Sequence, residues 1–281
     1  MGSRDTRRVL GPDKSVGCEV LQPLEPLPFL KQDGRRRDGR LPHHSRKLFM
    51  SVGMITQAKG SSYIEVGNTK VCCGVYGPKD VQRGQDFKMA GQVLCTVKMA
   101  PFSCLQRLSP QPDKRQQEMS RQLKNTLESI IILEKFPKSQ IDVFVTVIED
   151  AGSLLASCVT AAGLALCHAN IDVYDMVVGS SMLWHNNKLY TTPPERRRNT
   201  AAQEEEEGGD SGGGGGGGDS GGGGGGLSQL TVGMIPKHAG GQVALLVQGG
   251  GQMSPSNLSS GLEMAADLCT GLHALGPEDI D

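Results

Sequence analysis

The segment Glu149-Asp150-Ala151-Gly152-Ser153 is the place in this sequence where residue types and spacing could support chemistry. The alternating run from Ile141 to Val147 predicts a strand before it, and an apolar run that Ser153 can cap predicts a helix after it. The N–H groups at the start of a helix, together with the helix dipole, form a binding site for an anion. The segment is therefore a candidate site for phosphate or another oxyanion.

Other signatures of catalytic or metal chemistry are missing from the sequence. The six histidines have no carboxylate or cysteine at a metal-ligand spacing, and the eight cysteines include no C-x-x-C pair, so neither a metal nor a cofactor is predicted. No P-loop, no G-x-G-x-x-G after a strand and no G-x-S-x-G elbow is present. Cys73, Cys95 and Cys158 lie among apolar residues, which predicts buried thiols in a reducing compartment.

Hydrophobic periodicity predicts the elements that position the 149–153 segment. The expected order is four strands, a helix, a strand, a helix, further strands and a last helix. Gly67-Asn68 should close a hairpin, because this dipeptide readily adopts positive φ. The predicted bounds are strands near 48–58, 63–66, 70–76 and 92–100, a helix from Asp113 to before Pro137, a strand from 141, a helix over 154–169, strands at 177–183, 188–190, 230–235 and 242–247, and a helix capped by Ser256.

The composition is that of a globular chain, with 37% apolar and 21% charged residues and a net charge of -1. No apolar run is long enough for a signal peptide or a membrane span, so membrane and secreted classes are not expected. Residues 1–47 are rich in proline and hold eleven Lys/Arg against six Asp/Glu, which predicts an extended basic arm. Residues 191–226 hold fifteen of the 39 glycines and a glutamate run, so we expect a disordered insertion within one domain, 48–190 and 227–275.

Four ordered blocks give the sequence a family resemblance. Arg-Asp-Gly-Arg at 37–40, the block Gly60 to Val71, Met-Ala-Pro at 99–101 and Glu-Asp-Ala-Gly-Ser at 149–153 resemble the RNase PH family in order and spacing. The resemblance covers about Arg35 to Leu272 without the insertion. It implies an α/β, RNase PH-like fold, also called ribosomal protein S5 domain 2-like, made of two strand-rich halves with crossover helices. It further implies phosphorolytic 3′ to 5′ exoribonuclease chemistry at a Gly-Thr-Arg-Thr turn and a later Asp.

The chain departs from that pattern at both functional positions. Leu154 and Leu155 stand where the arginine and second threonine of the family turn belong, and Thr231 stands where the family places its catalytic Asp. An arginine would match phosphate with planar paired donors, whereas leucine cannot bind it. A family member without this site resembles the non-catalytic ring subunits of the eukaryotic RNA exosome. That resemblance implies RNase PH-like ring subunits, OB-fold cap subunits and threaded single-stranded RNA as partners, with nucleus, nucleolus and cytoplasm as compartments.

The resemblance also implies positions that contact the RNA backbone. Arg115 and Arg121 match family arginines before and within the long helix, while Lys98 and Arg107 flank the Met-Ala-Pro segment. The alternative for each is an ordinary solvated charge. Arg35 to Arg37 could bind RNA or pack along a neighbouring subunit, and the second is favoured.

Two further functions stay open at the level of sequence. One is an active phosphate-dependent exoribonuclease that uses Arg115 and a carboxylate from the insertion. The other is a stand-alone RNA-binding module that works through the arm and the insertion.

Overall fold

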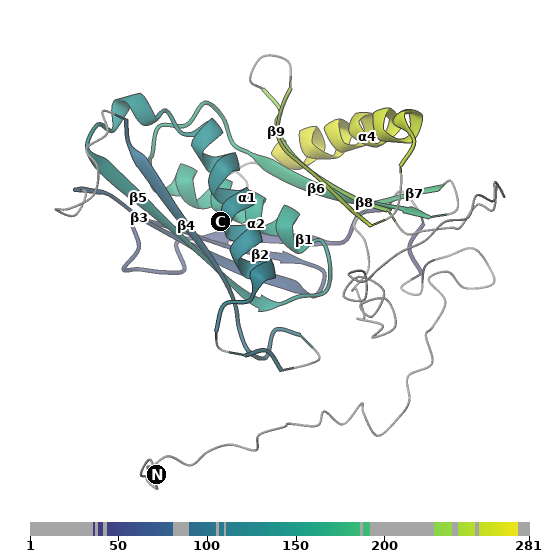
Figure 1. The fold of residues 1–281 in the computed structure, drawn as a ribbon, viewed down its shortest axis with the longest axis horizontal. Helices are drawn as coiled ribbons and strands as arrows, with labels where there is room; N and C mark the ends of the chain where they lie inside the picture. The colour runs from purple at the N-terminus through teal and green to yellow at the C-terminus, as the bar shows by residue number, and fades with distance from the viewer. Residues whose placement is uncertain are drawn as a thin grey trace, which may run out of the picture.

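A computed structural model describes residues 36, 39–41, 44–80, 90–104, 107–109, 111–185, 188–191, 228–237, 241–250 and 253–274. The described elements follow the predicted order. A first sheet has the strand order β1-β2-β3-β5-β4, and a second sheet has the order β7-β6-β8-β9 (Figure 1). The bounds are β1 (Leu48–Val52), β2 (Gly60–Val66), β3 (Thr69–Asp80), β4 (Gln92–Met99), α1 (Lys114–Ile130), η2 (Leu133–Lys135), β5 (Ser139–Glu149), α2 (Leu154–His168), β6 (Val178–His185), β7 (Lys188–Thr191), β8 (Ser228–Ile235), β9 (Gln242–Gly250) and α4 (Pro255–His273).

The hairpin predicted at Gly67-Asn68 is confirmed. Val66 of β2 pairs with Thr69 of β3, and Gly67 has a φ of 61°, which favours glycine. The prediction that the first strand continues past residue 52 is wrong. Gly53, with a φ of 82°, turns the chain out of β1, and its N–H donates to the Ser61 carbonyl at 3.0 Å.

Helix α1 forms the crossover between the parallel strands β4 and β5. Its apolar stripe is buried as predicted, through Met119, Leu123, Leu127 and Ile130. The helix ends before Pro137 is reached, because Ile131 has an extended backbone and pairs with Val173. Side chains of α1 also satisfy the outer edge of β4, since Ser120 Oγ accepts from the Val97 N–H at 2.9 Å and Gln116 Oε1 accepts from the Met99 N–H at 3.4 Å.

Helix α2 lies between the two sheets, as its uniformly apolar and small residues predict. Twelve of its fifteen residues are buried, and it contacts β2 and β3 on one side and β6 and β8 on the other. Glycines let the backbones approach closely: a Cβ on Gly60 of β2 would lie 2.3 Å from the Ala165 carbonyl oxygen. On the opposite side, a Cβ on Gly179 of β6 would lie 2.5 Å from the Ala156 carbonyl oxygen. The helix therefore completes the cores of both sheets.

Helix α4 covers the other face of the second sheet (Figure 1), where Gly261 lies against Leu230 and Trp184. The predicted cap at Ser256 is wrong by two residues. Ser254 is the N-cap and accepts a hydrogen bond from the Asn257 N–H, because Pro255 suits the first helical position and lacks the N–H that would be unsatisfied there. None of the helices in the described part of the chain is long and apolar enough to cross a membrane.

The far end of α4 is held by an interaction that the sequence did not predict. His273 Nε2 lies 3.1 Å from Asp175 Oδ1, and the same carboxylate accepts from the Lys237 N–H at 3.0 Å. Partial burial raises the pKa of Asp175. The hydrogen bonds from His273 and from two backbone N–H groups lower the pKa by more than burial raises it, so the net pKa is below its usual value. His273 is therefore a structural partner of this carboxylate.

Arg36, from the basic run 35–37, lies against this chain itself. It is buried, and its guanidinium lies 5.2 Å from the centroid of the Tyr190 ring on β7. A cation over an aromatic ring in a buried setting is stabilising. The expectation that this arginine contacts RNA or a neighbouring subunit is therefore wrong for Arg36, while Arg35, Arg37, most of the predicted arm and residues 192–226 of the predicted insertion lie outside the described residues.

Candidate functional site

The turn between β5 and α2 has the tight backbone that an anion-binding turn would need. Gly152 has a φ of 97°, and Ser153 has a φ of 59° in the left-handed region. Ser153 occupies the N-cap position, as predicted, but its side chain makes no capping hydrogen bond. Its Oγ is buried without a hydrogen-bond partner in the described structure.

Protein groups already occupy the first N–H donors of this turn. Thr69 Oγ1, at the start of β3, accepts from the Ala151 N–H at 3.1 Å and donates to the Gly152 carbonyl at 2.8 Å. The Gly152 N–H donates to Asp150 Oδ1 at 3.2 Å. The Asp150 N–H donates to the Ser103 carbonyl at 2.9 Å. Three successive donors that could hold an oxyanion are therefore directed at protein acceptors.

A carboxylate occupies the place where an anion would be favoured. The Asp150 side chain is largely buried at the start of α2, and its Oδ2 lies 3.4 Å from Arg115 Nη2 of α1. The carboxylate takes the favourable interaction with the helix dipole and repels a second anion. Arg115 is the cation that contacts the turn within the described residues, and Asp150 partly neutralises it.

The residues that the sequence resemblance aligns with the family's functional positions also lie around this turn. Leu154 is buried in the apolar core and Leu155 is half-buried, so neither offers a cation. Thr231 of β8 is buried opposite Ser181 of β6. Successive inward positions of β6 approach earlier residues of α2, because Val177 lies near Gly163 and Gly179 lies near Ala156. The next inward position of β6, Ser181, therefore lies towards the start of α2. The structure thus places the Thr231 hydroxyl towards the end of α2 where the turn lies.

Cys158, one turn into α2, is fully buried below the turn. Burial raises the pKa of its thiol strongly, and the Asp150 carboxylate raises the pKa further. Cys73 and Cys95 are buried as predicted, and burial raises the pKa of Cys95 to about 12. These thiols stay protonated at neutral pH and are not nucleophiles.

The four predicted RNA contacts are not brought into one cluster. Arg115 lies at the turn, and the loop that carries Arg107 lies beside the turn through the Ser103 contact. Arg121 is six residues along α1 and pairs with Glu118 at 2.9 Å. Lys98 is exposed between two inward-facing residues of β4, so it lies on the sheet face opposite α1.

Two features at this end of the domain were not predicted from the sequence. Phe102 follows Pro101 in the same loop and is 74% exposed, although nothing in a Pro-Phe dipeptide predicts exposure. The pairing of Asp150 with Arg115 joins residues 35 positions apart, for which no local pattern exists. Within the described residues, no group of three or more His, Cys, Asp or Glu side chains could hold a metal ion.

The fold and the turn define a two-sheet α/β domain of the RNase PH type. The model of the 3′ exoribonuclease family, domain 1, matches residues 44–172. An exosome complex component MTR3 from Homo sapiens is 33% identical over 191 residues, which cover 63% of this chain and 67% of that protein. The chain belongs to the RNase PH family of 3′ exoribonucleases.

Another relative matches part of the chain, and solved structures share its fold. An exosome complex component Rrp41 from Pyrobaculum arsenaticum is 41% identical over 159 residues, or 56% of this chain and 64% of that protein, so the match spans less than two thirds of its length. The fold is similar to that of rice Rrp46, with a TM-score of 0.64 and 21% identity, covering 85% of this chain and 97% of that one. It is also similar to an Archaeoglobus fulgidus exosome with RNA bound to the active site, with a TM-score of 0.65 and 20% identity over 86% and 92% of the two chains. The predicted RNase PH-like fold is thus confirmed.

Proposed function

We propose that this chain is a non-catalytic ring subunit of an RNA exosome and supports 3′ to 5′ RNA processing by threading RNA to a separate nuclease. The names of its relatives, exosome components Rrp41 and MTR3, support the ring role. The non-catalytic part of the proposal rests on the turn from Asp150 to Leu154. There the Asp150 carboxylate lies where an anion would bind, and the buried Leu154 lies where a cation would hold that anion.

The proposal extends to the type of ring subunit and to its partners. The block from Lys59 to Glu65, the leucines at 154 and 155 and the glycine-rich insertion resemble the Mtr-three type of ring subunit. Its partners are then other RNase PH-like ring subunits, OB-fold cap subunits and single-stranded RNA in the channel. Its compartments are those of the eukaryotic exosome: nucleus, nucleolus and cytoplasm. Recovery of these chains with the purified protein tests the partner set.

An assay of the isolated chain tests the non-catalytic proposal. Incubation of the full chain with a single-stranded oligoribonucleotide and inorganic phosphate is expected to release no nucleoside diphosphate above a no-protein control, because the cation at the turn, Arg115, is already paired with Asp150 and Leu154 adds none for the attacking phosphate. Thin-layer chromatography of the products measures this, with a phosphorolytic enzyme as the positive control. Nucleoside diphosphates at an enzyme-like rate would support the active exoribonuclease instead.

RNA contact is proposed to centre on the loop beside the turn. Phe102 offers an exposed ring on which a base can stack, and Arg107 and Arg115 supply positive charge at the same end of the domain. Arg121 and Lys98 lie farther along α1 and on the other sheet face, and we assign them weaker, purely electrostatic roles.

Truncation of the exposed ring tests this RNA surface. In the assembled ring, Phe102→Ala is expected to lower ultraviolet crosslinking of oligouridylate to this chain by about tenfold, since stacking contributes about 1–3 kcal/mol per base. Tyr174→Ala, at an exposed aromatic residue in the segment after α2, is the matched control and should leave crosslinking unchanged. Equal crosslinking of the Phe102→Ala variant and the wild type would refute the assignment.

Deletion of residues 195–226 should leave assembly intact, whereas a stand-alone RNA-binding module would lose RNA binding.

A further inference from the structure

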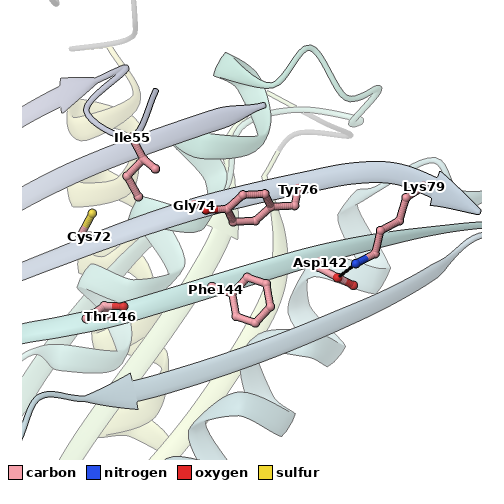
Figure 2. A pocket seen from close by; sticks show the side chains of 8 residues that line it. All are labelled: Ile55, Cys72, Gly74, Tyr76, Lys79, Asp142, Phe144 and Thr146. Atoms are coloured by element: carbon pink, nitrogen blue, oxygen red, sulfur yellow. Dashed lines mark hydrogen bonds and ion pairs between the residues drawn. The ribbon is translucent and has the colours of Figure 1, made fainter. Parts of the chain in front are cut away.

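The first sheet has one face covered by α1 and α2 and an opposite face that no described element packs across. Side chains alternate along β3, β4 and β5, so that the buried valines and cysteines face the helices. The residues between them point to the open face, and Figure 2 shows Tyr76, Phe144, Cys72 and Thr146 there with the helices behind the sheet. The register adds Leu94 and Lys98 of β4 to the same face, beside Asp142 and Thr146.

This open face is more apolar than a solvated sheet face. A half-exposed sheet normally alternates apolar residues towards the core with polar residues towards water. Here Leu94 is 46% exposed, Phe144 is 41% exposed, and Phe49 of β1 is 57% exposed. Contiguous exposed apolar side chains rimmed by polar ones mark interaction surfaces.

A hollow lies in the middle of the face, with a volume of about 540 Å³. Ile55 borders it on one side, and the rings of Tyr76 and Phe144, 5.8 Å apart at an interplanar angle of 71°, border it on the other (Figure 2). Gly74 contributes no side chain to fill it. The hollow is therefore shaped by apolar walls that can receive an apolar side chain from outside.

The charged groups around the hollow are already paired. The Asp142 carboxylate binds Lys79 Nζ and accepts from Gln140 Nε2 at 2.6 Å. At the other end of the face, Lys70 pairs with Glu149 at 3.0 Å. These charges cancel in pairs, and Lys98 lies on β4 at the edge of the sheet. The centre of the face therefore offers little to a polyanion such as RNA and matches an uncharged, apolar occupant.

The N-terminal arm of this chain is a poor occupant. Its apolar stretch contains Pro23, Pro26 and Pro28, and the chain enters the described structure at Arg36, which is buried against Tyr190 of the second sheet.

The face also has the size of a subunit contact. Five strands spaced about 4.8 Å apart, with about seven residues each, span roughly 24 by 24 Å. This is of the order of the roughly 800 Å² that each partner buries in a stable interface.

We propose that the open face of the first sheet is a subunit interface, on which a neighbouring RNase PH-fold chain packs apolar side chains into the hollow beside Phe144. The inference rests on the proposed ring function and adds the surface and the chemistry of the partner contact.

The test places a charge on the face and measures assembly. The full chain is co-expressed with each other RNase PH-family chain of its organism, and the affinity of each stable pair is measured by analytical ultracentrifugation. Leu94→Arg combined with Phe144→Arg should raise the dissociation constant of one pair by at least about 30-fold, the effect of losing a hot spot of about 2 kcal/mol. Both residues are substantially exposed, so the far-ultraviolet circular dichroism of the variant should match that of the wild type.

Leu246→Arg is the matched control, because Leu246 is 49% exposed on β9 of the second sheet. It should change the same dissociation constant by less than about threefold. Equal effects of the control and the double variant, or no effect of the double variant, overturn the inference while leaving the ring function intact. Self-association of the isolated chain through this face, or loss of RNA crosslinking with assembly unchanged, also overturns it. A wild-type chain that pairs with no family member overturns the ring function itself.

A measurement on the wild-type chain avoids any effect of substitution on folding. Cys72 lines the hollow and is partly accessible, so a maleimide should modify it in the free chain. Modification should fall at least about tenfold in the pair, while Cys167 at the end of α2 should react equally in both states. Unchanged labelling of Cys72 in a stable pair contradicts the inference.

Discussion

Gly60→Ala and Gly179→Ala are each expected to destabilise the domain by about 3 kcal/mol or more. The new Cβ would lie 2.3 Å from the Ala165 carbonyl oxygen in the first variant and 2.5 Å from the Ala156 carbonyl oxygen in the second. Both clashes are with the backbone of α2, which cannot rotate away as a flexible side chain can. Relief requires the helix to move from one sheet while it is packed against the other. Urea unfolding followed by circular dichroism measures the loss.

Gly249→Ala is the control for these substitutions, because Gly249 also lies in a strand. A Cβ there meets nothing within 4 Å, and its φ is not in the positive region. Its free energy of unfolding should change by less than about 1 kcal/mol. Equal losses in all three variants would show that the intrinsic cost of replacing a strand glycine, and not the contact with α2, sets the effect.

Thr69→Val is expected to destabilise the domain by roughly 2–4 kcal/mol and to loosen the turn before α2. Valine keeps the shape of threonine but removes the hydroxyl that binds both the Ala151 N–H and the Gly152 carbonyl. Thr69 is fully buried, so water does not readily replace the hydroxyl, and each unsatisfied group costs about 1–3 kcal/mol. Hydrogen exchange at Ala151 should accelerate together with the loss of stability.

Thr126→Val supplies the comparison for Thr69→Val. Thr126 is equally buried, but its hydroxyl donates to the Gln122 carbonyl four residues earlier within α1, a carbonyl that the helix already satisfies. The expected cost is below about 1 kcal/mol. A similar loss in the two variants would mean that the Thr69 contact does not specify the turn.

Local patterns predicted the elements of this fold well. The Gly67-Asn68 hairpin and the all-apolar α2 depend on neighbouring residues and on periodicity, and the structure has both. The errors arose where one residue overrides a pattern. Gly53 ends β1 although the alternation continues beyond it, and Pro255 moves the start of α4 to follow Ser254.

The sequence predicted where the candidate site lies but not which side chains pair with its polar groups. The 149–153 segment is a strand-to-helix turn, as its sequence indicates. The groups of this turn are paired with Thr69 and Arg115, which are far away in sequence. Hydrophobic periodicity does not predict contacts between such distant residues. The direction of Lys98 was available from the sequence, because the inward residues Val97 and Met99 on either side place it on the opposite face.

The position of α2 between the sheets bears on how the domain holds together. Each sheet relies on the same helix for part of its core, so neither half is a separate folding unit. The chain should melt in one cooperative step, and a cut between β7 and β8 should leave two fragments that stay associated. A link at that position can then vary in length without disturbing either sheet.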